Sequence, residues 1–195
     1  SPVISSTTDF YVGAENYAAT SAGRTAPSST TSDYWTNYGL VFNTSTDIVI
    51  NSVVVYPVNT APANMTIQLL NSSGLQVPGT SNVVFMPISG TGSTPQTVNL
   101  NYTVPAGNNY KLVISGGMSY SNKLVQESSG YSYPITLGPV SITSNWNGSY
   151  SSTSYYDWFY NWNITKVCSS PRTAVAASVT AAPSISASAT PNVIC

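Results

Sequence analysis

Residues 96–104 read QTVNLNYTV, and this stretch decides the fold class. Its apolar residues fall at every second position: Val98, Leu100, Tyr102 and Val104. The residues between them are Thr or Asn. A period of two is typical of a half-buried β-strand, with one face in a core and the other in water.

Similar short runs recur along the chain, at 39–42, 47–56, 65–71, 82–86, 110–115, 123–127, 140–143 and 155–167. Turn residues separate nearly all of them. Asn71–Gly74 and Ala106–Asn109 offer the positive φ angles that tight connections need, so each predicts a hairpin. Eight or more short strands with no helical stretch predict an all-β fold, an antiparallel β-sandwich of jelly-roll-like topology. An immunoglobulin-like sandwich is the alternative.

The composition supports the same fold class and excludes several partners. Only 6% of the residues are charged and histidine is absent, whereas a typical soluble domain has about 25% charged residues. Ser, Thr and Asn therefore provide the soluble surface, and these residues disfavour helices. A net charge of -1 leaves no basic footprint for nucleic acid or for anionic membranes. No apolar run is long enough for membrane insertion.

The domain organisation has a boundary near Cys168. We expect residues 1–168 to form the sandwich module, with an irregular N-terminal part over Glu15–Tyr38, where no alternation is sustained. Residues 169–195 are expected to form a strand and then a linker of small Ala, Ser, Thr and Pro residues that leads to a next module. Within the N-terminal part, Tyr34, Trp35 and Tyr38 are expected to anchor the loop against the sandwich.

The search for catalytic groups argues against an enzyme. Without histidine, catalytic triads that use an imidazole base and the common His metal sites are excluded. The acidic residues show no spacing that singles out a glycosidase pair: Asp9, Glu15, Asp33, Asp47, Glu127 and Asp157. The turn-like surroundings of Asp33 and Asp47 predict that these carboxylates cap turns. Asp157 is unusual because it lies between Tyr156 and Trp158.

Metal sites are not predicted. Calcium is the one cofactor that the sequence leaves possible. Its site would have to be assembled from distant loops, because the chain has no D-x-D-x-D-G loop. Cys168 and Cys195 are too far apart in sequence for a compact thiolate motif. A mutual disulfide between them would close a loop of about 27 residues and stabilise the fold by roughly 3–4 kcal/mol.

The best candidate for a binding surface is the aromatic run 155–162, YYDWFYNW. In an extended strand, alternation places four large rings on one face: Tyr156, Trp158, Tyr160 and Trp162. If that face is exposed, it is a platform for the apolar faces of sugars, with Trp146 and Tyr150 as contributors. If it is buried, the rings are the core of a central strand. The sequence leaves both interpretations open.

Several segments resemble a β-sandwich module of very large secreted surface adhesins of the Bacteroidota: GLVFNTSTDIVINSVVVYP (39–57), MTIQLLNSSG (65–74), VNLNYTVPAGNNYKLVISG (98–116) and YDWFYNWNIT (156–165). The tail CSSPRTAVAASVTAAPSISASATPNVIC (168–195) is similar to the junction that precedes an immunoglobulin-like repeat in those proteins. The resemblance implies export, tandem repeats, and adhesion, gliding or surface filaments. It also implies that Cys195 belongs to the next repeat and pairs there.

These observations together predict a non-enzymatic structural or adhesive module of a secreted, extracellular or cell-surface protein. Its expected partners are neighbouring modules of the same chain. Because a surface so poor in charge offers little repulsion between copies, a homo-oligomer or filament is a further expectation. The alternative function is a carbohydrate-binding module that recognises surface glycans through the aromatic platform.

Overall fold

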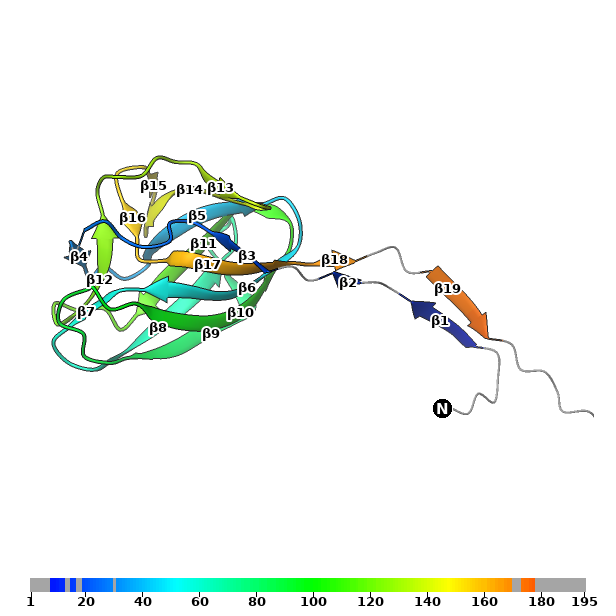
Figure 1. The fold of residues 1–195 in the computed structure, drawn as a ribbon, viewed down its shortest axis with the longest axis horizontal. Helices are drawn as coiled ribbons and strands as arrows, with labels where there is room; N and C mark the ends of the chain where they lie inside the picture. The colour runs from blue at the N-terminus through cyan, green and yellow to red at the C-terminus, as the bar shows by residue number, and fades with distance from the viewer. Residues whose placement is uncertain (1–7, 13–14, 17–18, 30, 170–172, 178–195) are drawn as a thin grey trace, which may run out of the picture. The chain divides into compact units, whose positions relative to one another are not determined.

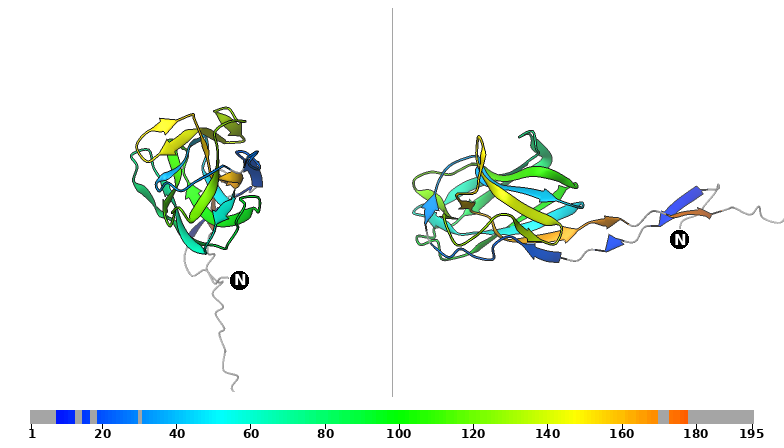
Figure 2. Two further views of the ribbon diagram at one scale, coloured as in Figure 1. Left: turned by 90° about the vertical axis from the view of Figure 1, so that its left-hand side faces the viewer. Right: turned by 90° about the horizontal axis from the view of Figure 1, so that it is seen from above.

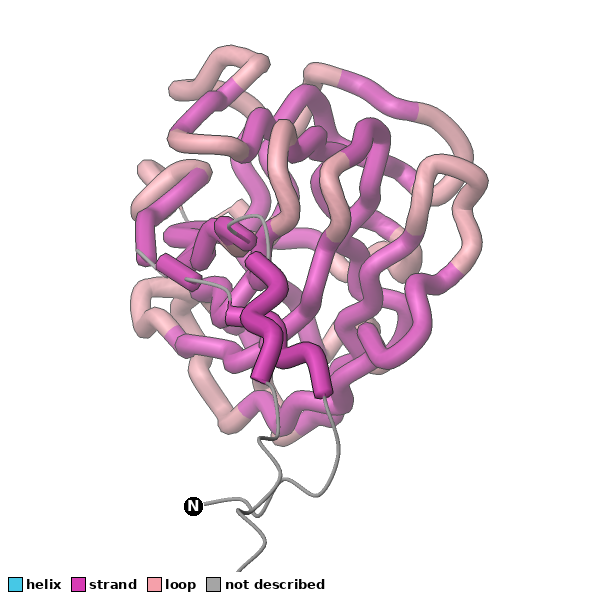
Figure 3. Tube along the Cα trace, turned by 90° about the vertical axis from the view of Figure 1, so that its right-hand side faces the viewer, coloured by secondary structure: helices cyan, strands magenta, loops and turns pink. Residues whose placement is uncertain are grey.

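The computed structural model describes residues 8–12, 15–16, 19–29, 31–169 and 173–177. Figure 3 shows strands and loops in these residues and no helix. The chain divides into two units, one formed by Asn16–Cys168 and the other by Ser1–Glu15 with Ser169–Cys195. We call the first unit the body.

Two antiparallel sheets form most of the body, and Figures 1 and 2 show them as two layers. The larger sheet has the order β13 (Ile135–Leu137), β14 (Val140–Asn147), β5 (Tyr38–Thr44), β11 (Gly107–Gly116), β8 (Ala63–Leu70) and β9 (Gln76–Met86), with β15 (Ser151–Ser152) beside β14. The smaller sheet has the order β10 (Gln96–Val104), β6 (Ile48–Val55), β17 (Tyr160–Lys166) and β3 (Ala19–Ala22). The predicted all-β sandwich is confirmed.

A third, small sheet is centred on β12 (Asn122–Glu127). It contains β16 (Tyr156–Asp157), β12 and β4 (Ser32–Asp33) in that order, and β7 (Pro57–Asn59) also pairs with β12. The pairing of Leu124 with Asp33 brings the segment after β4 close to the turn before β12. This sheet therefore joins parts of the chain that are far apart in sequence.

The second unit contains β1 (Thr8–Val12), which pairs antiparallel with β19 (Thr173–Ala177). A further short pair joins β2 (Glu15–Asn16) to β18 (Cys168–Ser169). The sequence places residues 1–168 in one module, whereas the structure groups residues 1–15 with the C-terminal segment because β1 pairs with β19. The predicted linker lies outside the described residues.

Strand β10 has the predicted bounds, and all four of its alternating apolar residues are buried. The hairpin predicted at Asn71–Gly74 is also present, because it joins the paired strands β8 and β9, and the Gly74 N–H donates to the Asn71 carbonyl at 3.0 Å. The hairpin predicted at Ala106–Asn109 is wrong. There the chain passes from β10 in one sheet to β11 in the other.

The N-terminal part is less irregular than predicted. Residues Ala19–Ala22 form β3 and pair with β17, and Ser32–Asp33 form β4 and pair with β12. The sequence ATSA consists of small residues, so it carries almost no hydrophobic alternation. Its strand conformation comes from hydrogen bonding to the edge of β17, which local sequence patterns do not reveal.

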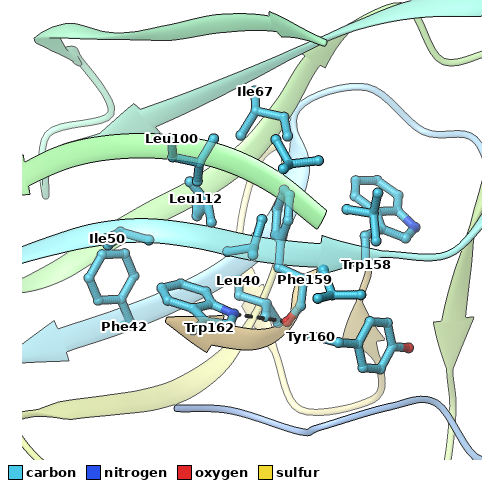
Figure 4. Packing of buried hydrophobic residues seen from close by; sticks show 14 of the residues in the cluster. Leu40, Phe42, Ile50, Ile67, Leu100, Leu112, Trp158, Phe159, Tyr160 and Trp162 are labelled. Carbon is cyan, nitrogen blue, oxygen red and sulfur yellow. Dashed lines mark hydrogen bonds between the residues drawn. The ribbon is translucent and has the colours of Figure 1, made fainter. Parts of the chain in front are cut away.

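The core lies between the two sheets (Figure 4). Leu40 and Phe42 of the larger sheet, Ile50 and Leu100 of the smaller sheet, and Trp162 of β17 are all buried in one cluster. The ring centroids of Phe42 and Trp162 lie 5.1 Å apart in a T-shaped arrangement. Such aromatic pairs add about 0.5–1.5 kcal/mol beyond the area they bury.

Candidate functional site

The four rings predicted as a sugar platform are core residues. Tyr156, Trp158, Tyr160 and Trp162 each have an exposed fraction of 0%, and Figure 4 shows the last three among the packed side chains of the core. They cannot form an exposed platform, and the alternative interpretation that the sequence left open is the one that holds.

The predicted alternation fails because the aromatic run is not one regular strand. Trp158, with a left-handed φ of 61°, lies between β16 and β17. Asn161, with φ of 41°, lies within β17 at the register shift between Tyr160 and Asn163. All of 156–160 is consequently buried. The irregular run also satisfies polar atoms, since the hydroxyl of Tyr156 and Nε1 of Trp162 each donate to the Phe159 carbonyl at 2.8 Å.

The two predicted contributors lie outside the buried core: Trp146 is in β14, and Tyr150 follows that strand. Tyr150 is 63% exposed, and Trp146 is half-buried. Nζ of Lys111 lies 4.9 Å from the centroid of the Trp146 ring and donates to the Asn71 and Ser72 carbonyls. One face of Trp146 is therefore already occupied by a cation. Trp146 also lines a cavity of about 470 Å³.

A different set of rings reaches the surface, with two exposed and two half-buried members, and sequence reasoning missed it as a site. We call it the aromatic ladder, defined as Tyr120, Tyr34, Trp35 and Tyr38. Consecutive ring centroids lie 6.1 Å apart for Tyr120 and Tyr34, 5.5 Å for Tyr34 and Trp35, and 6.1 Å for Trp35 and Tyr38. Tyr120 is 77% exposed and Trp35 is 50% exposed.

The ladder is attached to the core at one end. Tyr38, the first residue of β5, stacks on the buried Trp158 with 6.2 Å between ring centroids. The main chain N–H of Tyr34 donates to the Asp33 carboxylate at 2.8 Å, which fixes the start of the segment. Tyr38 thus anchors the loop as predicted. Trp35 does so only in part, because half of its surface is exposed to solvent.

One cation belongs to the ladder. Nζ of Lys123 lies 4.3 Å from the ring centroid of Tyr120 and 5.4 Å from that of Tyr34. Contacts of this kind contribute about 0.5–1 kcal/mol each at exposed sites. The lysine therefore lies over the rings of Tyr120 and Tyr34 and not over that of Trp35.

The chemistry of this surface suits stacking with a neutral, partly apolar ligand. Exposed rings offer flat apolar faces, and the tyrosine hydroxyls add hydrogen-bonding groups at their ends. Exposed aromatic patches on a soluble domain mark interaction sites. The pyranose ring of a sugar, with C–H groups on its faces and hydroxyls at its rim, matches such a surface.

The acidic residues have structural partners. Asp157 is fully buried and accepts hydrogen bonds from Nε2 of Gln126 at 2.7 Å and Nδ2 of Asn145 at 3.1 Å. The pKa of Asp157 is raised to about 7, chiefly by burial and to a smaller extent by the charge of Asp33, against the two hydrogen bonds, which lower it. Glu127 is also buried, and its Oε2 lies 2.7 Å from Nε of Arg24.

Asp33 and Asp47 both accept main-chain N–H groups as predicted, but Asp33 lies in β4 rather than in a turn, and the partner of Asp47 is distant in sequence. The Asp33 carboxylate accepts the Tyr34 N–H, as described above, and Oδ1 of Asp47 accepts the Ala106 N–H at 2.8 Å. Asp47 thus holds the connection between β10 and β11 in place. Such contacts satisfy backbone N–H groups that no strand pairs.

The calcium site and the Cys168–Cys195 disulfide stay expectations from the sequence. Within the described ranges, no group of three or more His, Cys, Asp and Glu side chains could hold a metal ion. The possible pairing of Cys168 with Cys195 involves a residue outside the described part of the chain. No helix in the described part is both long and apolar enough to cross a bilayer.

Comparison with known proteins gives little. No protein-family model matches the chain, and no curated protein matches it. Among solved structures, it is similar to the VP2 subviral particle of infectious bursal disease virus, with a TM-score of 0.24 and 12% sequence identity. That similarity covers 85% of this chain and 42% of the viral chain. So weak a likeness indicates no function.

Proposed function

We propose that this chain is a non-enzymatic adhesive module of an extracellular protein, and that it binds neutral polysaccharide through the aromatic ladder. The observation that carries this proposal is the ladder itself, in which Trp35 and Tyr120 expose large rings at 50% and 77%. By contrast, the core rings of Trp158 and Trp162 in the same body are fully buried.

The low charge of the chain supports a neutral ligand. Charged residues make up 6% of the sequence, and the ladder has a single lysine that already contacts two of its rings. Binding would therefore rest on stacking and hydrogen bonds rather than on ion pairs. Such binding depends little on salt, in contrast to recognition of a polyanion.

The sandwich supports an adhesive role in mechanical terms. Its two sheets are antiparallel throughout, and hydrogen bonds between neighbouring strands lie across the chain direction. The small-residue composition of 181–191 suits a spacer to a neighbouring module. The extracellular setting is supported by the resemblance to secreted surface adhesins and by the Ser-, Thr- and Asn-rich surface.

Replacing Trp35 by Ala should weaken binding to the recognised polysaccharide by about tenfold or more, because aromatic anchors dominate such interfaces. The measurement is affinity electrophoresis of the whole chain against neutral glucans, mannans, xylans and galactans. Tyr150→Ala is the matched control, since Tyr150 is 63% exposed and outside the ladder. The proposal fails if no polysaccharide retards the wild-type chain, or if both variants bind as the wild type does.

A further inference from the structure

A row of side chains crosses the outer face of the larger sheet, the face turned away from the smaller sheet. Residues opposite one another in neighbouring strands are Trp146 of β14, Gly39 of β5, Val113 of β11 and Gln68 of β8. The row faces outward because Leu40 and Leu112, the adjacent residues of β5 and β11, point into the core. Two large side chains therefore flank two smaller residues on this face.

The ring of Trp146 is fixed on the sheet before any ligand binds. It reaches across β5 to β11, since Gly39 opposite it has no side chain in the way. Nζ of Lys111 lies 4.9 Å from the ring centroid and donates to the Asn71 and Ser72 carbonyls at 3.3 and 3.1 Å. Because Lys111 is only 6% exposed, the ring face that it covers points into the protein. The accessible part of the ring is on its other side.

A cavity of about 470 Å³ lies beside this ring. Such a volume is within the range of about 300–1,000 Å³ that is usual for small-ligand sites. Its lining includes three amide side chains, Asn37, Gln68 and Gln76, and the apolar Leu70. No charged side chain lines it. The cavity therefore suits a neutral ligand.

The amides in the cavity are oriented by bonds to their neighbours. Nε2 of Gln68 donates to Oγ of Ser81 at 3.2 Å and to Oε1 of Gln76 at 3.4 Å. Gln68 donates in both contacts, so its oxygen can accept from a ligand, while the nitrogen of Gln76 can donate to one. Sugar hydroxyls do both. An apolar ring beside such amides matches a pyranose, whose C–H face stacks while its hydroxyls bind.

The cavity begins where the aromatic ladder ends. Asn37, which lines the cavity, lies between Trp35 and Tyr38 in sequence. A Cβ built on Gly148, another lining residue, would lie 3.7 Å from Cβ of Asn37 and 3.9 Å from Cε1 of Tyr38. Lys123 contacts the rings at the opposite end of the ladder. The ladder and the cavity are therefore neighbours.

We propose that the Trp146 cavity is a second sugar subsite, and that it binds the same linear neutral polysaccharide as the ladder. This inference rests on the proposed function and narrows the ligand to a chain that is recognised along its length rather than at one terminal sugar. Affinity should rise with oligosaccharide length until both subsites are filled, because linked contacts act at a high effective concentration.

Nuclear magnetic resonance of the whole chain tests the subsite through the indole N–H signals of its four tryptophans. The probes are short and long oligosaccharides of neutral glucans, mannans, xylans and galactans. The signals of Trp35 and Trp146, assigned with Trp35→Phe and Trp146→Phe, should shift together at the same concentration of a long oligosaccharide. Those of the buried Trp158 and Trp162 should stay in place.

The outcomes separate this inference from the proposed function. A Trp146 signal that stays in place, or that shifts at a different concentration from that of Trp35, overturns the second subsite and leaves binding at the ladder standing. If neither signal shifts with any of these sugars, both proposals fail.

Affinities of variants give a second readout. Trp146→Ala should weaken binding of long oligosaccharides by about tenfold or more and leave binding of short ones at the ladder nearly unchanged. Gln76→Ala should weaken the same binding less, and because Gln76 is exposed this variant keeps the test valid if Trp146→Ala unfolds. Ile88→Ala, at a 63% exposed position outside both subsites, is the control. Long oligosaccharides that bind Trp146→Ala and Gln76→Ala as tightly as the wild type overturn the inference.

Discussion

Replacing Trp162 by Ala is expected to lower the free energy of unfolding by about 3–5 kcal/mol. Trp162 is fully buried, its ring packs edge-on against Phe42, and its Nε1 donates to the Phe159 carbonyl. The truncation leaves a cavity between the sheets and removes one of the two donors to that carbonyl, the other being the Tyr156 hydroxyl. Since domains are typically stable by about 5–15 kcal/mol, this is a large fraction of the total. Urea denaturation measures it.

The matched control is the same substitution at an exposed position. Trp35→Ala should lower the free energy of unfolding by less than about 1 kcal/mol, because half of the Trp35 surface is already in water. This result would also show that the loss of glycan binding in Trp35→Ala is not a loss of fold. Equal destabilisation by the two variants would contradict the assignment of Trp162 to the core and Trp35 to the surface.

The free energy of unfolding should fall by about 4 kcal/mol as the pH rises from about 4 to about 7. Burial raises the pKa of Asp157 from its ordinary value of 3.8 to about 7 in the folded chain. The folded state therefore holds this proton more tightly than the unfolded state. The stabilisation is complete below pH 3.8 and is lost as the pH rises through the folded pKa.

The hydrogen bonding around Asp157 fits a protonated carboxyl. Oδ1 of Asn145 is buried without a hydrogen-bond partner. Turning that amide about its terminal bond would let its oxygen accept the Asp157 proton. Urea denaturation between pH 4 and 8 tests the prediction, and Asp157→Asn should flatten the profile. An Asp157→Asn profile as steep as that of the wild type would contradict the assignment.

The sequence predicts the parts of this fold that depend on local patterns. Residues 96–104 form a half-buried strand because alternate side chains meet either core or water, and this signal is complete within nine residues. The same alternation does not predict which residues of the run 155–162 are buried. The left-handed Trp158 separates β16 from β17 within it, and a tryptophan gives no turn signal of the kind that glycine gives.

The aromatic ladder could not be derived from spacing. Tyr120 lies far along the chain from Tyr34, and they meet because Leu124 of β12 pairs with Asp33 of β4. The two-residue strand β4 carries no periodic signal of its own. The exposed aromatic residues were visible in the sequence, but their grouping is a property of the topology.

Tryptophan fluorescence with iodide quenching tests the proposed function most directly, because Trp35 is half-exposed while Trp158 and Trp162 are buried. Iodide should quench a fraction of the wild-type emission, and a saturating polysaccharide should protect that fraction. Trp35→Phe should remove most of the quenchable emission and, with it, the protection. Quenching that no polysaccharide reduces, or protection that persists unchanged in Trp35→Phe, would contradict binding at the ladder.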